Sequence, residues 1–130
     1  MEMALVHDLG ESIIGDAIYE SGTETIASLD KKHEDERRAI QEIFKDIPGK
    51  EHYISLWEEW VAQKTPEATF LKRIEKLEMA MQALEYERLG HDSVLLNEFW
   101  ENAWKYLKGT ELEKYYHELQ KQRNLLQRKK

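Results

Sequence analysis

Apolar residues recur at intervals of three and four along most of the chain, which is the spacing of one face of an α-helix. The pattern predicts helices over residues 31–47, 50–63, 65–90, 93–109 and 110–126. The clearest apolar stripe lies in the third of these, at Phe70, Ile74, Leu77, Met81 and Leu84. No stretch between turn residues alternates strictly between apolar and polar, so the pattern gives no support for strands.

Turn and capping residues set the expected helix ends. Pro48-Gly49 stops the first helix, and Thr65 is a typical N-cap for the third, with Pro66 in the first helical position. Residues 17–30 are the least periodic and are predicted to form a loop, with Asp30 as the N-cap of the helix that follows. We therefore expect a single all-α domain of short packed helices over residues 1–130.

The fourth and fifth helices are rich in large apolar side chains. In both, we expect the aromatic residues at helical spacing to lie in the core. In the fourth helix the apolar positions include Val94, Leu95, Phe99 and Trp104.

The first residues carry no helix-start signal. Met3, Ala4, Leu5 and Val6 have the pattern of a buried helix that is already under way. Because chain termini normally lie exposed, this pattern leads us to expect a shortened domain, with further sequence before Met1.

Composition narrows the classes of function. The 130 residues include 26 acidic and 19 basic side chains, a net charge of −7, and no cysteine. The absence of cysteine excludes disulfides, cysteine-ligated metals and thiol nucleophiles. The excess of acidic residues disfavours binding to nucleic acid, and no apolar run approaches the ~20 residues of a membrane span. We expect a soluble cytoplasmic protein with neither nucleic acid nor membrane as a partner.

The first candidate for chemistry is the pair His7-Asp8. An imidazole and a carboxylate together suit a divalent ion such as Mn²⁺, Mg²⁺, Co²⁺, Fe²⁺ or Zn²⁺. Adjacent residues of a regular helix point about 100° apart, so a shared ligand requires the helix to end there, as Gly10 suggests. The alternative is an ordinary hydrogen bond at a helix end.

Nearby carboxylates strengthen the interpretation as a metal site. Glu11 and Asp16 follow the pair among apolar residues, so burial of that apolar surface draws several acidic groups inward. A second candidate, Glu75, lies beside the apolar stripe of the third helix. Its alternative role is an ion pair with Lys72, three residues earlier on the same face.

Five segments in order along nearly the whole chain resemble the HD-domain phosphohydrolases. Within that family the chain is most similar to the small 5′-deoxynucleotidases, which remove phosphate from deoxyribonucleoside 5′-monophosphates. The segments are ALVHDLGESIIGD (4–16), KKHEDERRAI (31–40), LWEEW (56–60), TPEATFLKRIEKLEMAMQALEYE (65–87) and LNEFWENAW (96–104).

The resemblance implies an all-α, HD-domain-like helical bundle around a divalent metal ion. It implies that His7 and Asp8 are metal ligands and that Glu75 occupies the position of a further, late ligand. Glu11 and Asp16 match two acidic residues that the family uses at the active site, one beside the metal-bound water and leaving group, the other nearer the nucleotide. A metal ion lowers the pKa of a bound water and neutralises phosphoryl charge, while a carboxylate handles the proton.

Two positions depart from the family pattern. The family has a further metal-binding His and an Arg for the phosphate on a helix before the His-Asp pair, and residues 1–6 contain neither. The late ligand is Asp in the family, where this chain has Glu75, whose carboxylate is one methylene further from the backbone. That extension of ~1.3–1.5 Å is large against a metal-site tolerance of about 0.2 Å.

The sequence thus leads to a metal-dependent phosphomonoesterase that acts on (deoxy)nucleoside 5′-monophosphates, with weak or no activity in this chain. The alternative is a catalytically inactive HD-like helical module for ligand binding or self-association. A third interpretation is an incomplete copy of an ordinary enzyme. A shortened helical domain exposes apolar surface, so a homodimer is also expected.

Overall fold

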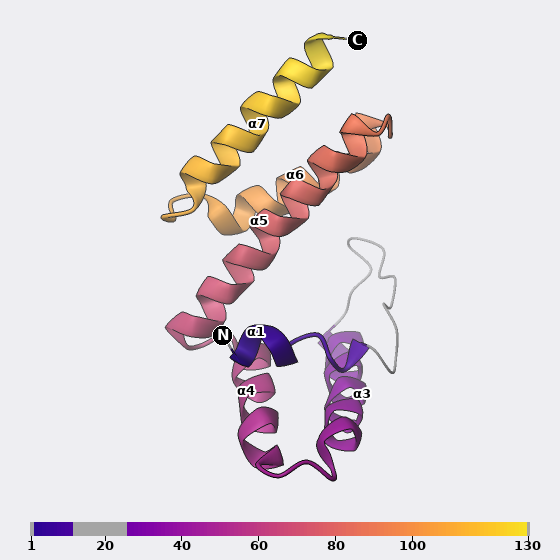
Figure 1. Cartoon of the computed structure of the whole chain (residues 1–130), viewed down its shortest axis with the longest axis vertical. Coiled ribbons are helices and arrows are strands. Elements are labelled where there is room, and N and C mark those ends of the chain that lie inside the picture. The colour runs from indigo at the N-terminus through magenta and orange to yellow at the C-terminus, as the bar shows by residue number, and fades with distance from the viewer. Residues whose placement is uncertain (1, 12–25, 130) are drawn as a thin grey trace. The chain divides into compact units, whose positions relative to one another are not determined.

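The structure, a computed structural model, describes residues 2–11 and 26–129, except for the side chains of residues 26–29. In these residues the regular structure is entirely helical, and none of the helices is long and apolar enough to cross a membrane. The helices are α1 (Glu2–Val6), α3 (Ile26–Phe44), α4 (Lys50–Ala62), α5 (Pro66–Arg88), α6 (Ser93–Leu107) and α7 (Glu113–Arg128) (Figure 1). The all-α prediction is confirmed.

The chain divides into two compact units, and the first spans Met1–Ala68. In this unit α4 packs against both α1 and α3 (Figure 1). The turn between α3 and α4 passes through Gly49, whose φ of 79° suits glycine better than any other residue. Buried apolar side chains of all three helices meet in one core, formed by Val6, Ile40, Phe44 and Trp57. This core anchors the short α1, which would be unstable alone.

The second unit spans Thr69–Lys130 and has its own core between α5, α6 and α7. Alanine residues of α5 and α6, at positions 80, 83 and 103, are buried there and leave room for larger neighbours. Trp100 and Tyr116 fill that space, with ring centroids 5.9 Å apart and the Tyr116 hydroxyl donating to the Trp100 carbonyl (3.1 Å). Each unit therefore has a hydrophobic core of its own, and the prediction of one domain over residues 1–130 stays a prediction.

A buried ion pair links the three helices of the second unit. The Arg123 Nε of α7 lies 2.9 and 3.1 Å from the two carboxylate oxygens of Glu87 on α5. Its Nη2 donates to the Ser93 carbonyl and to Asn97 on α6, and its guanidinium lies over the Trp100 ring. Because both charges have hydrogen-bond partners, their burial is tolerated.

Several helix ends were predicted correctly. Pro66 begins α5, and the Thr65 hydroxyl accepts a hydrogen bond from the Ala68 N–H (3.2 Å). By contrast, α3 begins at Ile26, so the loop prediction was wrong for residues 26–30, as was that of Asp30 as an N-cap. The rest of the predicted loop, residues 17–25, lies outside the described residues. A helix of nineteen residues needs no cap at that point, because its packing against α4 supplies the stability that periodicity does not reveal.

The predicted buried faces of α5 and α6 were wrong in part. On α5, Leu84 is buried, but Phe70, Ile74 and Met81 are exposed. The helix packs through the small residues Ala80 and Ala83, which allow close approach of its neighbours. On α6 the exposed side chains include Val94, Leu95 and Phe99, and on α7 Tyr115, while the adjacent apolar residues Leu96, Trp100 and Tyr116 are buried.

Candidate metal site

The His7-Asp8 pair lies in the turn directly after α1. Met3 and Val6 of α1 are buried, and Val6 packs into the first core. The His7 N–H donates to the Met3 carbonyl (3.0 Å), and the Leu9 N–H donates to the Val6 carbonyl (3.2 Å). The regular helix thus ends at the pair, which is the condition under which the two adjacent side chains can face the same point.

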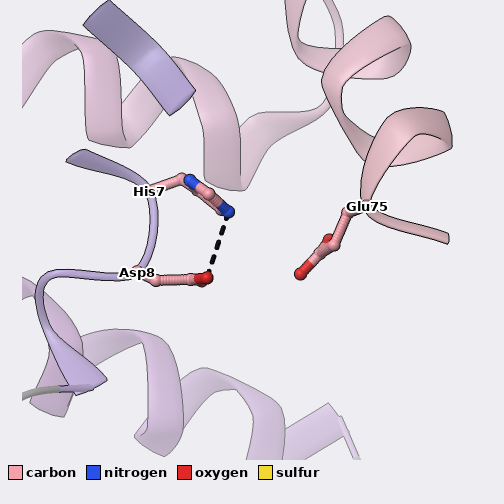
Figure 2. A group of neighbouring side chains, drawn as sticks. All are labelled: His7, Asp8 and Glu75. Carbon is pink, nitrogen blue, oxygen red and sulfur yellow. Dashed lines mark ion pairs between the residues drawn. The ribbon is translucent and has the colours of Figure 1, made fainter. Parts of the chain in front are cut away.

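The two nitrogens of the His7 ring have different partners. Nδ1 lies 2.6 Å from the carbonyl oxygen of Ala4, and because a carbonyl only accepts, Nδ1 carries a hydrogen. Nε2 faces Oδ2 of Asp8 at 3.1 Å (Figure 2). If the imidazole is neutral, Nε2 therefore directs a lone pair at a carboxylate oxygen. Two acceptors this close require a cation between them, either a proton on Nε2 or a metal ion.

The residues fit a divalent ion in chemistry and in spacing. Imidazole nitrogen and carboxylate oxygen are the ligands of Zn²⁺, Mn²⁺ and related ions. Nε2 and Oδ2 are 3.1 Å apart, close enough for both atoms to contact one ion. The His7 side chain is 15% exposed and that of Asp8 54%, so the pair is reachable from solvent. The hydrogen bond from Nδ1 to a carbonyl is also the usual support of a metal-bound histidine.

The other predicted site residues stand as follows. The half-buried Glu11 lies one turn after Asp8, and its N–H donates to the Asp8 carbonyl (3.1 Å). Asp16 lies outside the described residues. Glu75, drawn in Figure 2, belongs to α5 in the second unit and can offer a carboxylate oxygen to an ion. The predicted ion pair is present there, with Lys72 Nζ 3.4 Å from Glu75 Oε2.

Glu75 is also accessible from outside the second unit. It borders a cavity of about 260 Å³ between α5 and α6, lined mainly by apolar atoms of residues such as Met79 and Phe99. The Glu75 side chain is 35% exposed, although its Oε2 atom is buried.

Sequence reasoning missed two residues that support the pair. The Trp60 ring of α4 meets the His7 ring edge to face, with centroids 4.8 Å apart. The backbone of α3 at Glu36 approaches Gly10 so closely that a Cβ on Gly10 would lie 3.3 Å from the Glu36 carbonyl oxygen. The segment LWEEW contained Trp60, but no local signal relates it to a histidine more than fifty positions earlier.

Comparison with known proteins shows which family this chain resembles. The model of the HD domain matches residues 1–120. The 5′-deoxynucleotidase HDDC2 of Homo sapiens is 34% identical over 127 residues, covering 95% of this chain and 60% of that protein. HDDC2 of Xenopus laevis is 33% identical over 126 residues, covering 95% and 61%, and HDDC2 of Danio rerio is 40% identical over 99 residues, covering 76% and 48%.

The chain thus spans about three fifths of the length of these relatives from Homo sapiens and Xenopus laevis. No solved structure matches it. The HD-domain model matches residues 1–120, and the His-Asp pair follows the end of a helix in an all-α fold. The chain therefore belongs to the HD-domain family.

Proposed function

We propose that the chain is a metal-dependent phosphomonoesterase that converts deoxynucleoside 5′-monophosphates to nucleoside and phosphate. The observation that carries the proposal is the His7 Nε2 atom facing Asp8 Oδ2 at 3.1 Å, with the Nδ1 hydrogen bonded to Ala4. The relatives support the same reaction, since they are named as 5′-deoxynucleotidases. The inactive helical module is not favoured, because no feature of the described residues supports it over the enzyme.

Each candidate residue has a proposed role. His7 and Asp8 hold the ion, and Glu75 supplies a third ligand by its place in the family motif. A bound divalent ion would activate a water molecule and neutralise charge on the phosphoryl group. Glu11, one turn from the pair, exchanges a proton with the water or the leaving group, and Asp16 contacts the nucleotide. The identity of the metal is left open among the ions that accept nitrogen and oxygen ligands.

Phosphate release from dAMP and dTMP in the presence of Mn²⁺ or Co²⁺ tests this function. We expect slow release, because Glu75 is longer than the aspartate of the family pattern, and we expect His7→Ala to abolish it. His52→Ala is the matched control: His52 also lies beside a carboxylate, that of Glu2, but it is exposed and outside the pair. Equal rates for wild type and His7→Ala would overturn the proposal, and fast release would contradict the expected weakness.

We also propose that the protein is a cytoplasmic homodimer. Apolar side chains around the turn between α5 and α6 support self-association: Leu89, Val94 and Leu95 are 70–76% exposed. Light scattering of the wild type and of the double variant Leu89→Lys/Leu95→Lys tests the dimer. We expect a dimer that the double variant dissociates, and a monomeric wild type would refute it.

A further inference from the structure

The His7 ring is held on two sides within the first unit. The hydrogen bond from Nδ1 to the Ala4 carbonyl determines which nitrogen faces Asp8. That bond leaves the ring free to tilt about the axis through the bond. The Trp60 ring opposes this tilt, because its centroid lies 4.8 Å from that of His7 and the planes cross at 72°. The two contacts together define the direction of the Nε2 lone pair.

Trp60 belongs to the last turn of α4, and this turn is held by several hydrogen bonds. The side chain of Gln63 donates to the Trp60 carbonyl (2.7 Å), and the Gln63 N–H donates to the Glu59 carbonyl (3.2 Å). The Thr65 hydroxyl donates to the Glu59 carboxylate (2.8 Å). One turn earlier, Trp57 is fully buried in the first core. These contacts keep the end of α4 from fraying and so hold the backbone that carries the Trp60 ring.

We propose that Trp60 is a positioning residue that holds the imidazole of His7 in the orientation needed to bind a divalent metal ion. The inference rests on the proposed function, since it requires His7 to be a ligand. Residues that orient a metal-bound histidine typically account for 10–100-fold of metal affinity when they are replaced. In this role Trp60 acts through the His7 ring, which it contacts edge to face.

The second unit offers a matched control for this contact. Trp104 of α6 packs against His117 of α7, with ring centroids 5.5 Å apart and planes tilted by 53°. Both tryptophans are half-buried and lie on helices beside a histidine. His117 has no part in the proposed metal site, so replacing Trp104 removes a similar tryptophan–histidine contact without changing the orientation of His7.

The experiment compares the Mn²⁺ affinity of the purified wild type with that of three variants by titration calorimetry. We expect Trp60→Met, which fills space without a rigid ring, to weaken binding about 10–100-fold. Trp60→Phe restores an aromatic edge and is expected to lie within about threefold of the wild type, as is Trp104→Met. Circular dichroism checks that each variant is folded.

The outcomes separate the two proposals. If the wild type binds no Mn²⁺, both the metal site and the role of Trp60 are overturned. If the wild type binds Mn²⁺ and folded Trp60→Met binds it equally well, only the role of Trp60 is overturned.

If Trp60→Met does not fold, NMR of the wild type tests whether the ion binds beside Trp60, as the positioning role requires. Bound Mn²⁺ then broadens the indole N–H signal of Trp60, because the paramagnetic ion sits on the neighbouring imidazole. An unbroadened signal in the presence of bound Mn²⁺ overturns the positioning role.

Discussion

The imidazole of His7 is the side chain of the first unit that points most directly to a metal site, because its two nitrogens have different partners. Nδ1 of His7 donates to a carbonyl, so a neutral ring directs a lone pair from Nε2 at the carboxylate of Asp8. Without a cation this arrangement is repulsive, and with a metal ion it is attractive. In the metal-free protein only a proton on Nε2 can relieve this repulsion, whereas in the metal-bound protein the ion itself does.

The Asp8→Asn variant tests that reasoning. The amide can donate to Nε2 without an intervening cation, so we expect the metal-free protein to gain about 0.5–1.5 kcal/mol of unfolding free energy. We also expect the variant to lose the stabilisation that Mn²⁺ gives the wild type. Urea unfolding with and without Mn²⁺ measures both effects. A metal-free variant less stable than the wild type would contradict this reasoning.

At the scale of helices, the distance between α3 and the turn after α1 depends on Gly10. A methyl group there would lie 3.3 Å from the Glu36 carbonyl oxygen and 3.4 Å from the Glu36 Cβ, so α3 or the turn has to shift by a few tenths of an ångström. We expect Gly10→Ala to cost about 1–3 kcal/mol of stability. It should also weaken Mn²⁺ binding, because the shifted turn carries His7 and Asp8.

Thermal unfolding and calorimetric titration check the Gly10→Ala variant. Ser55→Ala, at an exposed position of α4 in the same unit, is the control and should change neither quantity. An unchanged affinity in a destabilised Gly10→Ala protein would show that the turn adjusts without moving the pair.

A second prediction at this scale concerns the contact of α6 with α7. Burial raises the pKa of the Tyr116 phenol, the Glu101 carboxylate raises it further, and the Arg123 guanidinium partly offsets both. The folded state therefore keeps the phenol neutral at pH values where an unfolded tyrosine, with a pKa of about 10, already ionises. The resulting stabilisation is complete below pH ~10 and is lost as the pH rises through the raised pKa.

Urea unfolding at pH 9 and pH 11 tests the role of this phenol. At pH 9 we expect Tyr116→Phe to be about 0.5–1.5 kcal/mol less stable than the wild type, because the hydrogen bond to the Trp100 carbonyl is lost. At pH 11 the difference should shrink or vanish. Tyr115→Phe, at the adjacent exposed position, should show no such dependence. A difference that stays constant between the two pH values would contradict the assignment.

The helices themselves were largely predictable, and their buried faces were less so. Periodicity and capping gave α4, α5 and the start of α6, where the Asp92 side chain accepts from the Val94 N–H. On α6, however, Leu95 and Leu96 are equally apolar, and only contact with α5 and α7 selects Leu96 for the core. On α5 the sequence favours large side chains, while close helix packing favours small ones such as Ala80.

The candidate site, too, was predictable from the sequence only in part. The residue types and spacing of the His-Asp pair indicate a metal site from the amino-acid sequence alone, because that chemistry is local. The support of His7 by Trp60 was not predictable, since it joins residues more than fifty positions apart through a packed core.

At the scale of the whole molecule, we propose from the family motif alone that the metal ligands come from both units. His7 and Asp8 belong to the first unit and Glu75 to the second, and each unit has its own core. A ligand that binds only the folded state stabilises it by about 2.7 kcal/mol at a hundred times its Kd. If all three residues bind one ion, that free energy stabilises both cores.

Hydrogen exchange at backbone amides in α3 and α6 measures the stability of each core separately. We expect saturating Mn²⁺ to slow exchange in both helices of the wild type, and only in α3 of Glu75→Ala, because that variant keeps His7 and Asp8 but loses the ligand from α5. Glu78→Ala, one turn later on α5, is the control and should behave as the wild type does. If Mn²⁺ slows exchange in α3 alone in the wild type, the ion is held by the His-Asp pair without Glu75, and the longer side chain of Glu75 has removed it from the site.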